Sequence, residues 1–191
     1  MMRNLLLIFI LGVVLISCAP SGVYMAPEFS TVESGARSII VDKGYDETWS
    51  ELIRFAGSNF FGIDNFEKAS GLITLGYGSN EASYYVTGGR YTLHDDAGRT
   101  LFDGDYVDFL TMNSSGRLSG RVNVIVESVA EMSTRITINA RYVINSTAGN
   151  WIFDTGGYAS VNVSNAAKGT SPNRILMPTY NVENGILAAL K

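Results

Sequence analysis

The chain has almost no cysteine or histidine, with one of each among its 191 residues. A disulfide needs two cysteines, and a structural zinc site usually draws several ligands from Cys and His, so neither can stabilise a single molecule. Charged residues are also scarce, at 17%, and the formal net charge is only −4. Such a weakly acidic surface disfavours nucleic acid and electrostatic attachment to an anionic membrane. The stability of the folded part must therefore come from its apolar core.

Long apolar runs are missing too, apart from one short stretch at the N-terminus. Met1–Asn4 carries one positive charge, and Leu5–Ile16 is apolar, interrupted only by Gly12. As a helix this run of about 12 residues would extend roughly 18 Å, whereas a membrane-spanning helix needs about 20 residues. A transmembrane helix is therefore disfavoured. A charged start followed by a short apolar segment is typical of a secretion signal.

The four residues Leu15-Ile16-Ser17-Cys18 close this segment and resemble the bacterial lipobox, in which a small residue directly precedes a cysteine. The resemblance implies cleavage between Ser17 and Cys18, a diacylglycerol on the Cys18 sulfur and acylation of its new amino group. Each buried methylene contributes roughly 0.8 kcal/mol, so two or more chains anchor a protein stably. The lipid bilayer is therefore the first expected partner, through acylated Cys18. The alternative is a signal peptide with an incidental cysteine near its end.

The residue after the cysteine bears on the destination of the protein. Lipoproteins that stay in the inner membrane tend to have Asp at this position, and this chain has Ala19. The resemblance therefore implies a lipid-anchored protein of the outer membrane that faces the periplasm.

Three segments follow from this organisation: a signal peptide over residues 1–17, the lipidated cysteine with a tether over residues 18–35, and one domain over residues 36–191. The tether is rich in Pro, Ser and Gly and shows no periodicity. A flexible chain of this length reaches roughly 20–25 Å. The remaining residues are enough for a single domain with a sizeable core.

The start of this domain predicts a short strand and then an amphipathic helix. Ser38–Val41 is rich in β-branched residues, which favour strands. Apolar residues then recur at helical spacing, at i, i+3, i+4, i+7 and i+11. They are Trp49, Leu52, Ile53, Ala56 and Phe60. Asp46 lies just before this stripe, and we expect its carboxylate to cap the helix.

Beyond this helix the pattern changes to short strands. Residues 61–66 and 72–75 predict a hairpin, residues 83–110 hold further strand candidates, and Val122, Val124 and Val126 alternate along a clear strand. The strand candidates between 83 and 110 read SYYVT, RYTLH and YVDFL. Residues 135–144 return along the sheet, 151–163 form one more strand interrupted at two glycines, and 182–190 end the chain as a short helix. We expect an α+β fold, in which helices pack on one face of an antiparallel meandering sheet.

One stretch of this domain has a second resemblance. Residues 42–77 resemble the opening of helix-grip envelope lipoprotein domains, such as those of the third lipoprotein of the β-barrel assembly machinery. Four residues carry the likeness: Trp49, Ile63, Gly71 and Ile73. The resemblance implies a fold, with a Trp-bearing helix gripped against a sheet, and it transfers no activity.

Residues with catalytic or metal-binding chemistry are few. The lone His94 lies in the polar segment His94–Gly98, where we expect a solvated turn and not a catalytic base. Asp103, Asp105 and Asp108 could gather oxygen ligands for calcium, but the spacing lacks the Gly and Glu of a calcium loop. We expect a solvated strand face or turn there, and no catalytic residue, metal or cofactor. The glycine pairs within 86–90 and 154–158 lack the strand-to-helix context of a phosphate loop and predict turns or bulges.

Three classes of function follow. The first is a non-enzymatic envelope lipoprotein that binds another envelope protein and supports assembly or integrity. The second is a carrier that holds an apolar ligand between its helix and its sheet. The third is an enzyme acting on glycan, for which two of Asp103, Asp105 and Asp108 would have to line one cleft. The sequence favours the first class.

Overall fold

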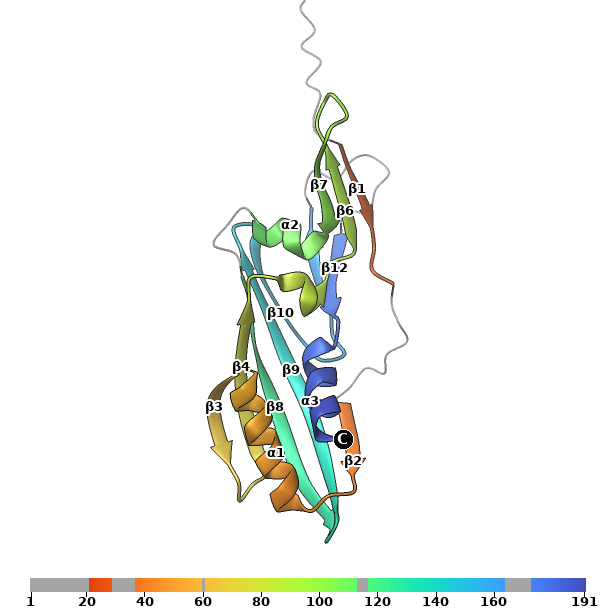
Figure 1. Ribbon diagram of the computed structural model, residues 1–191. Coiled ribbons are helices and arrows are strands. Elements are labelled where there is room, and N and C mark those ends of the chain that lie inside the picture. The colour runs from red at the N-terminus through yellow and green to blue at the C-terminus, as the bar shows by residue number, and fades with distance from the viewer. Residues whose placement is uncertain (1–20, 29–36, 60, 113–116, 164–172) are drawn as a thin grey trace, which may run out of the picture.

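A computed structural model describes residues 21–28, 37–59, 61–112, 117–163 and 173–191 of the chain. These residues form three α-helices, one short 3₁₀ turn and twelve strands in three antiparallel sheets. The helices are α1 (Tyr45–Ser58), α2 (Tyr106–Met112) and α3 (Asn181–Leu190). The expected α+β class is confirmed, although the strands are distributed over three sheets and not one (Figure 1).

The principal sheet has six strands and gives the molecule its long axis. Its order is β10-β9-β8-β4-β3, and β2 pairs with the other end of β9. The bounds are β2 Arg37–Val41, β3 Gly62–Glu67, β4 Leu72–Ser79, β8 Arg117–Ala130, β9 Ser133–Ser146 and β10 Gly149–Asp154. β8 and β9 form a long hairpin, and their alternating Val and Ile residues place one face of each strand in the core.

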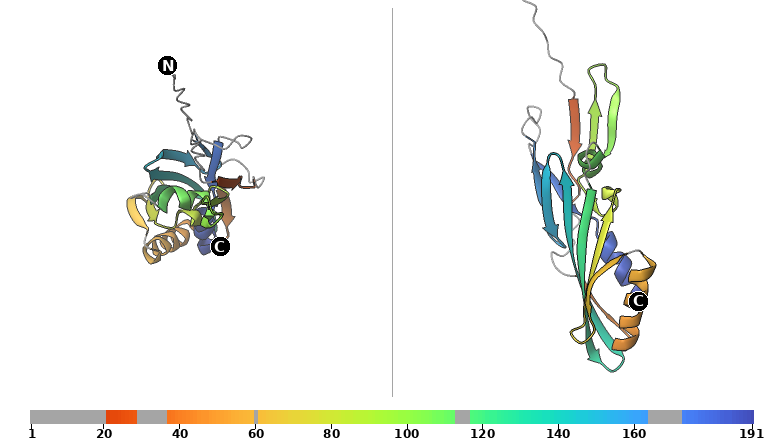
Figure 2. Two further views of the ribbon diagram at one scale, coloured as in Figure 1. Left: turned by 90° about the horizontal axis from the view of Figure 1, so that it is seen from above. Right: turned by 90° about the vertical axis from the view of Figure 1, so that its left-hand side faces the viewer.

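Of the two smaller sheets, one extends the molecule beyond one end of this hairpin and the other lies beside the principal sheet (Figures 1 and 2). One has the order β1-β6-β7 and the other β11-β12-β5. The first is built from β1 Ser21–Met25, β6 Arg90–His94 and β7 Thr100–Asp105. The second is built from β11 Ala159–Asn162, β12 Asn173–Pro178 and β5 Val86–Thr87. Helix α1 and the β8–β9 turn lie at the opposite end of the molecule.

The core lies between the principal sheet and the two helices α1 and α3. Trp49 is 5% exposed, and Leu52 of α1 and Ile186 of α3 have no exposed surface. They pack against the apolar residues of β4, β8 and β9, and α3 also contacts α1. The predicted helix stripe and C-terminal helix are therefore confirmed. Phe60, the last member of that stripe, lies outside the described residues.

The start of α1 differs from the prediction, since Asp46 does not cap the helix. Gly44 occupies the cap position with extended backbone, and no side chain in the described part of the chain caps the first turn. The carbonyl of Gly44 accepts from both the backbone N–H and the hydroxyl of Thr48. Asp46 therefore lies inside the first turn, where its carboxylate forms an ion pair with Lys68 at 2.7 Å.

Residues 106–110, predicted as a strand, form the first part of α2. Asp105 directly precedes them, and its carboxylate accepts from the backbone N–H of Val107 at 2.9 Å, as an N-cap does. Val107, Leu110 and Thr111 are then buried at helical spacing. The short apolar run is compatible with a strand and with a helix, and the cap that Asp105 provides favours the helix.

Two further segments differ from the prediction for tertiary reasons. Ser21–Met25, expected to belong to a flexible tether, forms β1 and pairs with β6. Residues 151–163, expected to form one interrupted strand, belong to β10 and β11 in two different sheets, because the turn around Gly156 redirects the chain. Neither difference follows from local periodicity, since each depends on a partner strand distant in sequence.

Candidate functional site

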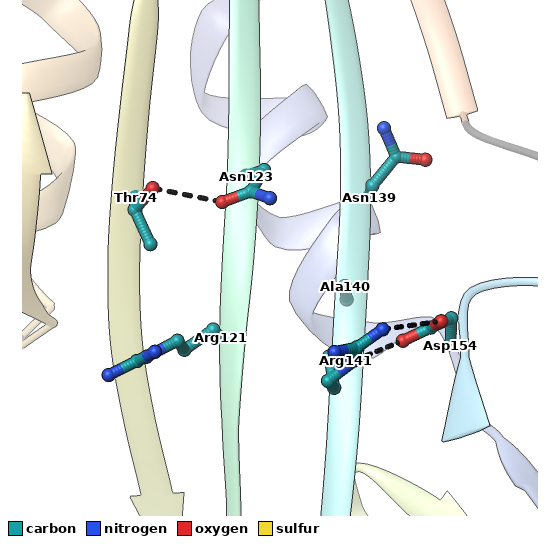
Figure 3. A pocket seen from close by; sticks show the side chains of 7 residues that line it. All are labelled: Thr74, Arg121, Asn123, Asn139, Ala140, Arg141 and Asp154. Carbon is teal, nitrogen blue, oxygen red and sulfur yellow. Dashed lines mark hydrogen bonds and ion pairs between the residues drawn. The ribbon is translucent and has the colours of Figure 1, made fainter. Parts of the chain in front are cut away.

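The helix-free face of the principal sheet is polar. Along β8 and β9 the inward residues are apolar, and the alternate residues Arg121, Asn123, Asn139 and Arg141 point away from the core. The register aligns these residues, since Asn123 lies opposite Asn139 and Arg121 opposite Arg141. Four polar side chains from two strands therefore gather at the centre of this open face (Figure 3).

Asn123 and Asn139 form the first of two polar rows across the sheet. Asn123 lies next to Thr74 of β4, whose hydroxyl is 2.9 Å from the Asn123 Oδ1 and donates to it. The Asn139 amide has no hydrogen-bond partner among the described residues, and it projects beside the hollow that these residues line (Figure 3). It can therefore both donate to and accept from a bound molecule.

The second row carries charge. Arg141 makes a bidentate pair with Asp154 of β10, at 2.7 and 3.0 Å. On the other side the Arg121 Nε donates to Asp64 of β3 at 2.9 Å and reaches across β4 at Gly76. A Cβ at Gly76 would lie 3.2 Å from the Asp64 carboxylate, so a larger residue would crowd this bridge. Across the sheet this row consists of Asp64, Arg121, Arg141 and Asp154, and its two positive and two negative charges sum to zero.

The ion pair between Arg141 and Asp154 fixes the charge state of these two groups. The hydrogen bonds from Arg141 hold the pKa of the Asp154 carboxyl below its usual value, and Asp154 in turn raises the pKa of the Arg141 guanidinium. Both groups are therefore ionised over the physiological range. They hold each other in place, which presents a fixed pattern of donors and acceptors to solvent.

The two rows line a shallow hollow of about 510 Å³ on the open face. Its residues are Thr74, Arg121, Asn123, Asn139, Ala140, Arg141 and Asp154. Because the charges balance, this surface suits a polar partner that exchanges hydrogen bonds better than a strongly charged ligand. The alternation of Val122, Val124 and Val126 predicted this strand, but the register that joins Asn123 to Asn139 and Arg141 could not be predicted from alternation alone.

A second hollow, of about 330 Å³, lies at the edge of the β1-β6-β7 sheet and is lined by Asp103 and Asp105. These two carboxyls have opposite environments. Bidentate hydrogen bonds from Arg90, at 3.0 and 2.8 Å, lower the pKa of Asp103. Burial raises the pKa of Asp105. The structure therefore brings two of the three candidate aspartates to one hollow.

Both carboxylates are nevertheless committed to structural contacts. Asp105 accepts from the Thr87 hydroxyl at 2.6 Å and from the backbone N–H groups of Gly88 at 2.7 Å and Val107 at 2.9 Å. Asp108, the third candidate, lies on α2, where it accepts from the backbone N–H of Ser83 at 3.1 Å. Asp105 thus ties the start of α2 to β5, a role that its position before the helix could have indicated.

His94 is the last residue of β6, and its Nδ1 lies 3.4 Å from the Thr100 hydroxyl. The predicted turn over His94–Gly98 is confirmed only beyond His94, where the Asp95 carboxylate accepts from the backbone N–H groups of Ala97 and Arg99. The prediction of a solvated turn residue is wrong for His94 itself, which is half-buried in the strand because it pairs with Ser21 and Thr100. Of the two glycine pairs, for which turns or bulges were predicted, the second forms a turn at residues 155–156 and the first connects β5 to β6. Gly89 and Gly156 both have positive φ, which glycine adopts without steric cost.

A buried acidic residue was missed by the sequence analysis. Glu183, in the first turn of α3, has no exposed surface. Its two carboxylate oxygens accept from the hydroxyls of Tyr142 at 2.7 Å and Thr155 at 2.8 Å. The pKa of the Tyr142 phenol is raised by burial and by this neighbouring carboxylate. The cluster connects α3 to β9, and no sequence pattern links residues so far apart.

The residues of the expected lipid attachment, Ser17 and Cys18, lie outside the described part of the chain. Within the described residues, no helix is long and apolar enough to cross a membrane. The same residues contain no group of three or more His, Cys, Asp or Glu side chains arranged to hold a metal ion.

Comparisons with protein-family models, curated proteins and solved structures found no match to this chain. Its function has therefore to be inferred from the sequence motif and the surfaces described above.

Proposed function

We propose that this protein is a lipid-anchored envelope lipoprotein of the outer membrane that faces the periplasm and acts without catalysis as a binding or assembly module. The observation that carries the binding role is the helix-free face of the principal sheet, where Arg121, Asn123, Asn139 and Arg141 line one hollow. The lipobox at Leu15–Cys18 supports the anchor, and acylated Cys18 would hold the protein to the bilayer.

The partner that this surface fits best is another envelope protein. Backbone and side-chain groups of a protein supply both donors and acceptors. The Asn139 amide, which has no hydrogen-bond partner among the described residues, and the paired Arg and Asp side chains can bind such groups. The ion pairs with Asp64 and Asp154 hold the two arginines before binding, so less side-chain entropy is lost on association. Balanced charge then favours a partner selected by hydrogen-bond geometry.

A photocrosslinking amino acid at position 139 tests the binding face. In intact envelopes we expect the Asn139 variant to form one discrete protein adduct, because its side chain projects beside the hollow. The matched control is a photocrosslinking residue in place of Ser50, which is exposed on α1 at the helix-covered side of the molecule. Equal adducts from both positions, or none from position 139, would remove this face as the binding site.

The anchor is tested separately. Replacing Cys18 with Ser should leave an unlipidated precursor and abolish processing that is sensitive to globomycin. A Cys18→Ser protein that still incorporates labelled palmitate would show that the lipobox interpretation is wrong.

A glycan-directed hydrolase is the second candidate, because Asp103 and Asp105 line one hollow and have pKa values shifted in opposite directions. Such a pair can divide the roles of acid and base. The discriminating measurement is release of soluble glycan fragments from purified peptidoglycan by the protein and by its Asp103→Asn variant. Activity that is lost in the variant would replace the non-enzymatic proposal.

A role of this protein as a carrier of an apolar ligand stays a prediction. Such a ligand would lie between α1 and the sheet, where Leu52, Ile73 and Leu75 have no exposed surface and fill the layer with side chains. Helix α1 would have to move to admit it.

A further inference from the structure

The first described strand places the N-terminal end of the domain at one end of the molecule. β1 pairs antiparallel with β6, so that Ser21 lies opposite His94 and Met25 opposite Arg90. His94 is the last residue of β6, directly before the turn that leads to β7. Ser21 therefore lies beside the β6–β7 turn, at the far end of the three-stranded sheet (Figures 1 and 2).

β1 is fixed to the rest of the domain by side-chain contacts as well as by its pairing. The Tyr24 hydroxyl accepts from the backbone N–H of Ile175 at 3.0 Å, and the Arg174 guanidinium lies 4.1 Å from the centre of the Tyr24 ring. The same ring packs edge-on against Tyr106. These contacts join β1 to β12 and α2, so Ser21 has a defined position in the domain.

Chain length then limits the distance between this end and the anchor. Cys18 precedes Ser21 by three residues, which span at most about 11 Å even when fully extended. The expected reach of roughly 20–25 Å assumed that the whole of residues 19–35 was flexible. With Ser21–Met25 paired in β1, only three residue steps separate the anchor from the folded sheet.

The opposite end of the molecule is far from this point. β8 and β9 have 14 residues each, so the β8–β9 turn lies roughly 40 Å from the other end of these strands. The β1-β6-β7 sheet extends beyond that other end (Figure 1). Two ends of an elongated domain are thus defined, one close to the residue that carries the lipid and one distant from it.

We infer that the lipidated protein stands on the membrane, with the β6–β7 turn against the phospholipid headgroups and the β8–β9 turn directed away from the bilayer. This inference rests on the proposed acylation of Cys18. The turn suits a headgroup layer and not hydrocarbon, because Asp95, Asp96 and Arg99 make it polar, and Asp95 and Arg99 are joined at 2.7 Å. The surface is therefore a contact face for phospholipid headgroups.

A single-thiol labelling experiment tests this orientation in the full, lipidated chain. Acylation consumes the sulfur of Cys18, the only native cysteine, so each introduced cysteine gives a unique site. Asp96→Cys places a fluorophore on the β6–β7 turn, and Glu131→Cys places one on the β8–β9 turn. Both positions are exposed, and both substitutions remove one negative charge, which makes them a matched pair.

The labelled proteins are reconstituted into phosphatidylethanolamine–phosphatidylglycerol vesicles that contain a headgroup-linked dark quencher. We expect several-fold greater quenching at position 96 than at position 131. Equal quenching, or greater quenching at 131, would overturn the orientation. If the Asp96→Cys protein melts below the parent protein, Ala97→Cys replaces it in the same turn.

The experiment distinguishes an error in the inferred orientation from an error in the proposed acylation of Cys18. Vesicle flotation and palmitate labelling of the same samples report the anchor. A protein that neither floats nor carries palmitate contradicts the proposed function, and with it the orientation. A protein that floats and is acylated, but shows equal quenching at the two positions, contradicts the orientation alone. Forms of the labelled proteins that lack residues 1–18, and so have neither signal segment nor lipid, should show no quenching.

Discussion

Glu183 shows how a single residue can couple two distant elements. Its carboxylate has no exposed surface and no basic partner in the ion pairs of the described residues, yet it accepts two hydrogen bonds from hydroxyl groups. It also lies in the first turn of α3, where the helix dipole favours a negative charge. Burial of a polar group costs less when it is hydrogen-bonded in this way. Removing the acceptor should therefore cost more than replacing any exposed acidic residue.

Glu183→Gln tests this coupling. The amide keeps the size of the side chain but replaces one acceptor oxygen with a donor, which faces a hydroxyl of Tyr142 or Thr155. Hydrogen bonds to charged groups contribute about 1.5–3 kcal/mol, so we expect the free energy of unfolding to fall by about 2–3 kcal/mol in urea titrations. The exposed control Glu131→Gln should change it by less than about 0.5 kcal/mol. Equal stability of Glu183→Gln and the parent would contradict the proposed role.

The Asp154–Arg141 pair predicts a pH dependence of stability. Arg141 lowers the pKa of Asp154 in the folded state below its ordinary value of 3.8, so the folded protein releases this proton more readily than the unfolded chain. The pair therefore stabilises the fold above the unfolded pKa, and this contribution is lost as pH falls through the folded pKa.

Chemical denaturation of the parent and of Asp154→Asn measures this effect. The parent should be slightly more stable near neutral pH, because exposed ion pairs contribute little. The difference should shrink as pH falls below 3.8. A difference that stays constant down to the acid limit would show that Asp154 acts through packing and not through its charge.

Among the elements, α1 depends strongly on the core for its stability. No described side chain caps its first turn, so its stability depends on the buried stripe that includes Trp49, Leu52 and Ala56. The Trp49 ring also stacks with Tyr45 at a centroid distance of 6.2 Å. Helix α2 differs, because Asp105 caps its first turn and ties it to β5. The two helices are therefore sensitive to different substitutions.

Trp49→Ala should strongly destabilise the domain. Truncation of a buried aromatic residue to Ala typically costs about 3–5 kcal/mol, a large part of a total stability of about 5–15 kcal/mol. We expect a clear fall in the melting temperature by circular dichroism, and none beyond a degree or so for the exposed control Ser50→Ala. A Trp49→Ala domain that melts with the parent would show that α1 contributes little to the core.

The whole molecule is elongated, and the proposed anchor and the candidate binding face lie on different parts of it. The helix-free face follows the long axis of β8 and β9, whereas Ser21 lies at the end formed by the β1-β6-β7 sheet (Figure 1). The lipid would therefore hold the protein near a partner without covering the binding face. Its main contribution would be a higher local concentration at the membrane.

This arrangement predicts how loss of the lipid affects function. A periplasmic, unlipidated form at the normal level should fail to complement a deletion, and strong overexpression should partly restore function because it replaces the lost effective concentration. The unlipidated domain should keep its fold, which a thermal melt can check. Full complementation at the normal level would contradict the role of binding at the membrane. It would favour the alternatives, a carrier of an apolar ligand or an enzyme.

The sequence by itself determined the features that depend on short-range patterns. The stripe of Trp49 and Leu52 predicts α1 because a helix repeats every 3.6 residues, and alternation along residues 121–127 and 135–144 predicts the β8–β9 hairpin. The lipobox is also a local motif, so Cys18 could be proposed as the anchor without any structure.

The tertiary structure decided the features that join distant segments. Ser21–Met25 has no periodicity of its own and becomes a strand only because β6, about 70 residues later, supplies its partner groups. The row of Arg121 and Arg141 depends on the register of two strands and on Gly76, and the burial of Glu183 depends on a tyrosine 41 residues away. Such contacts are fixed by packing of the whole chain, so the local sequence around each residue does not predict them.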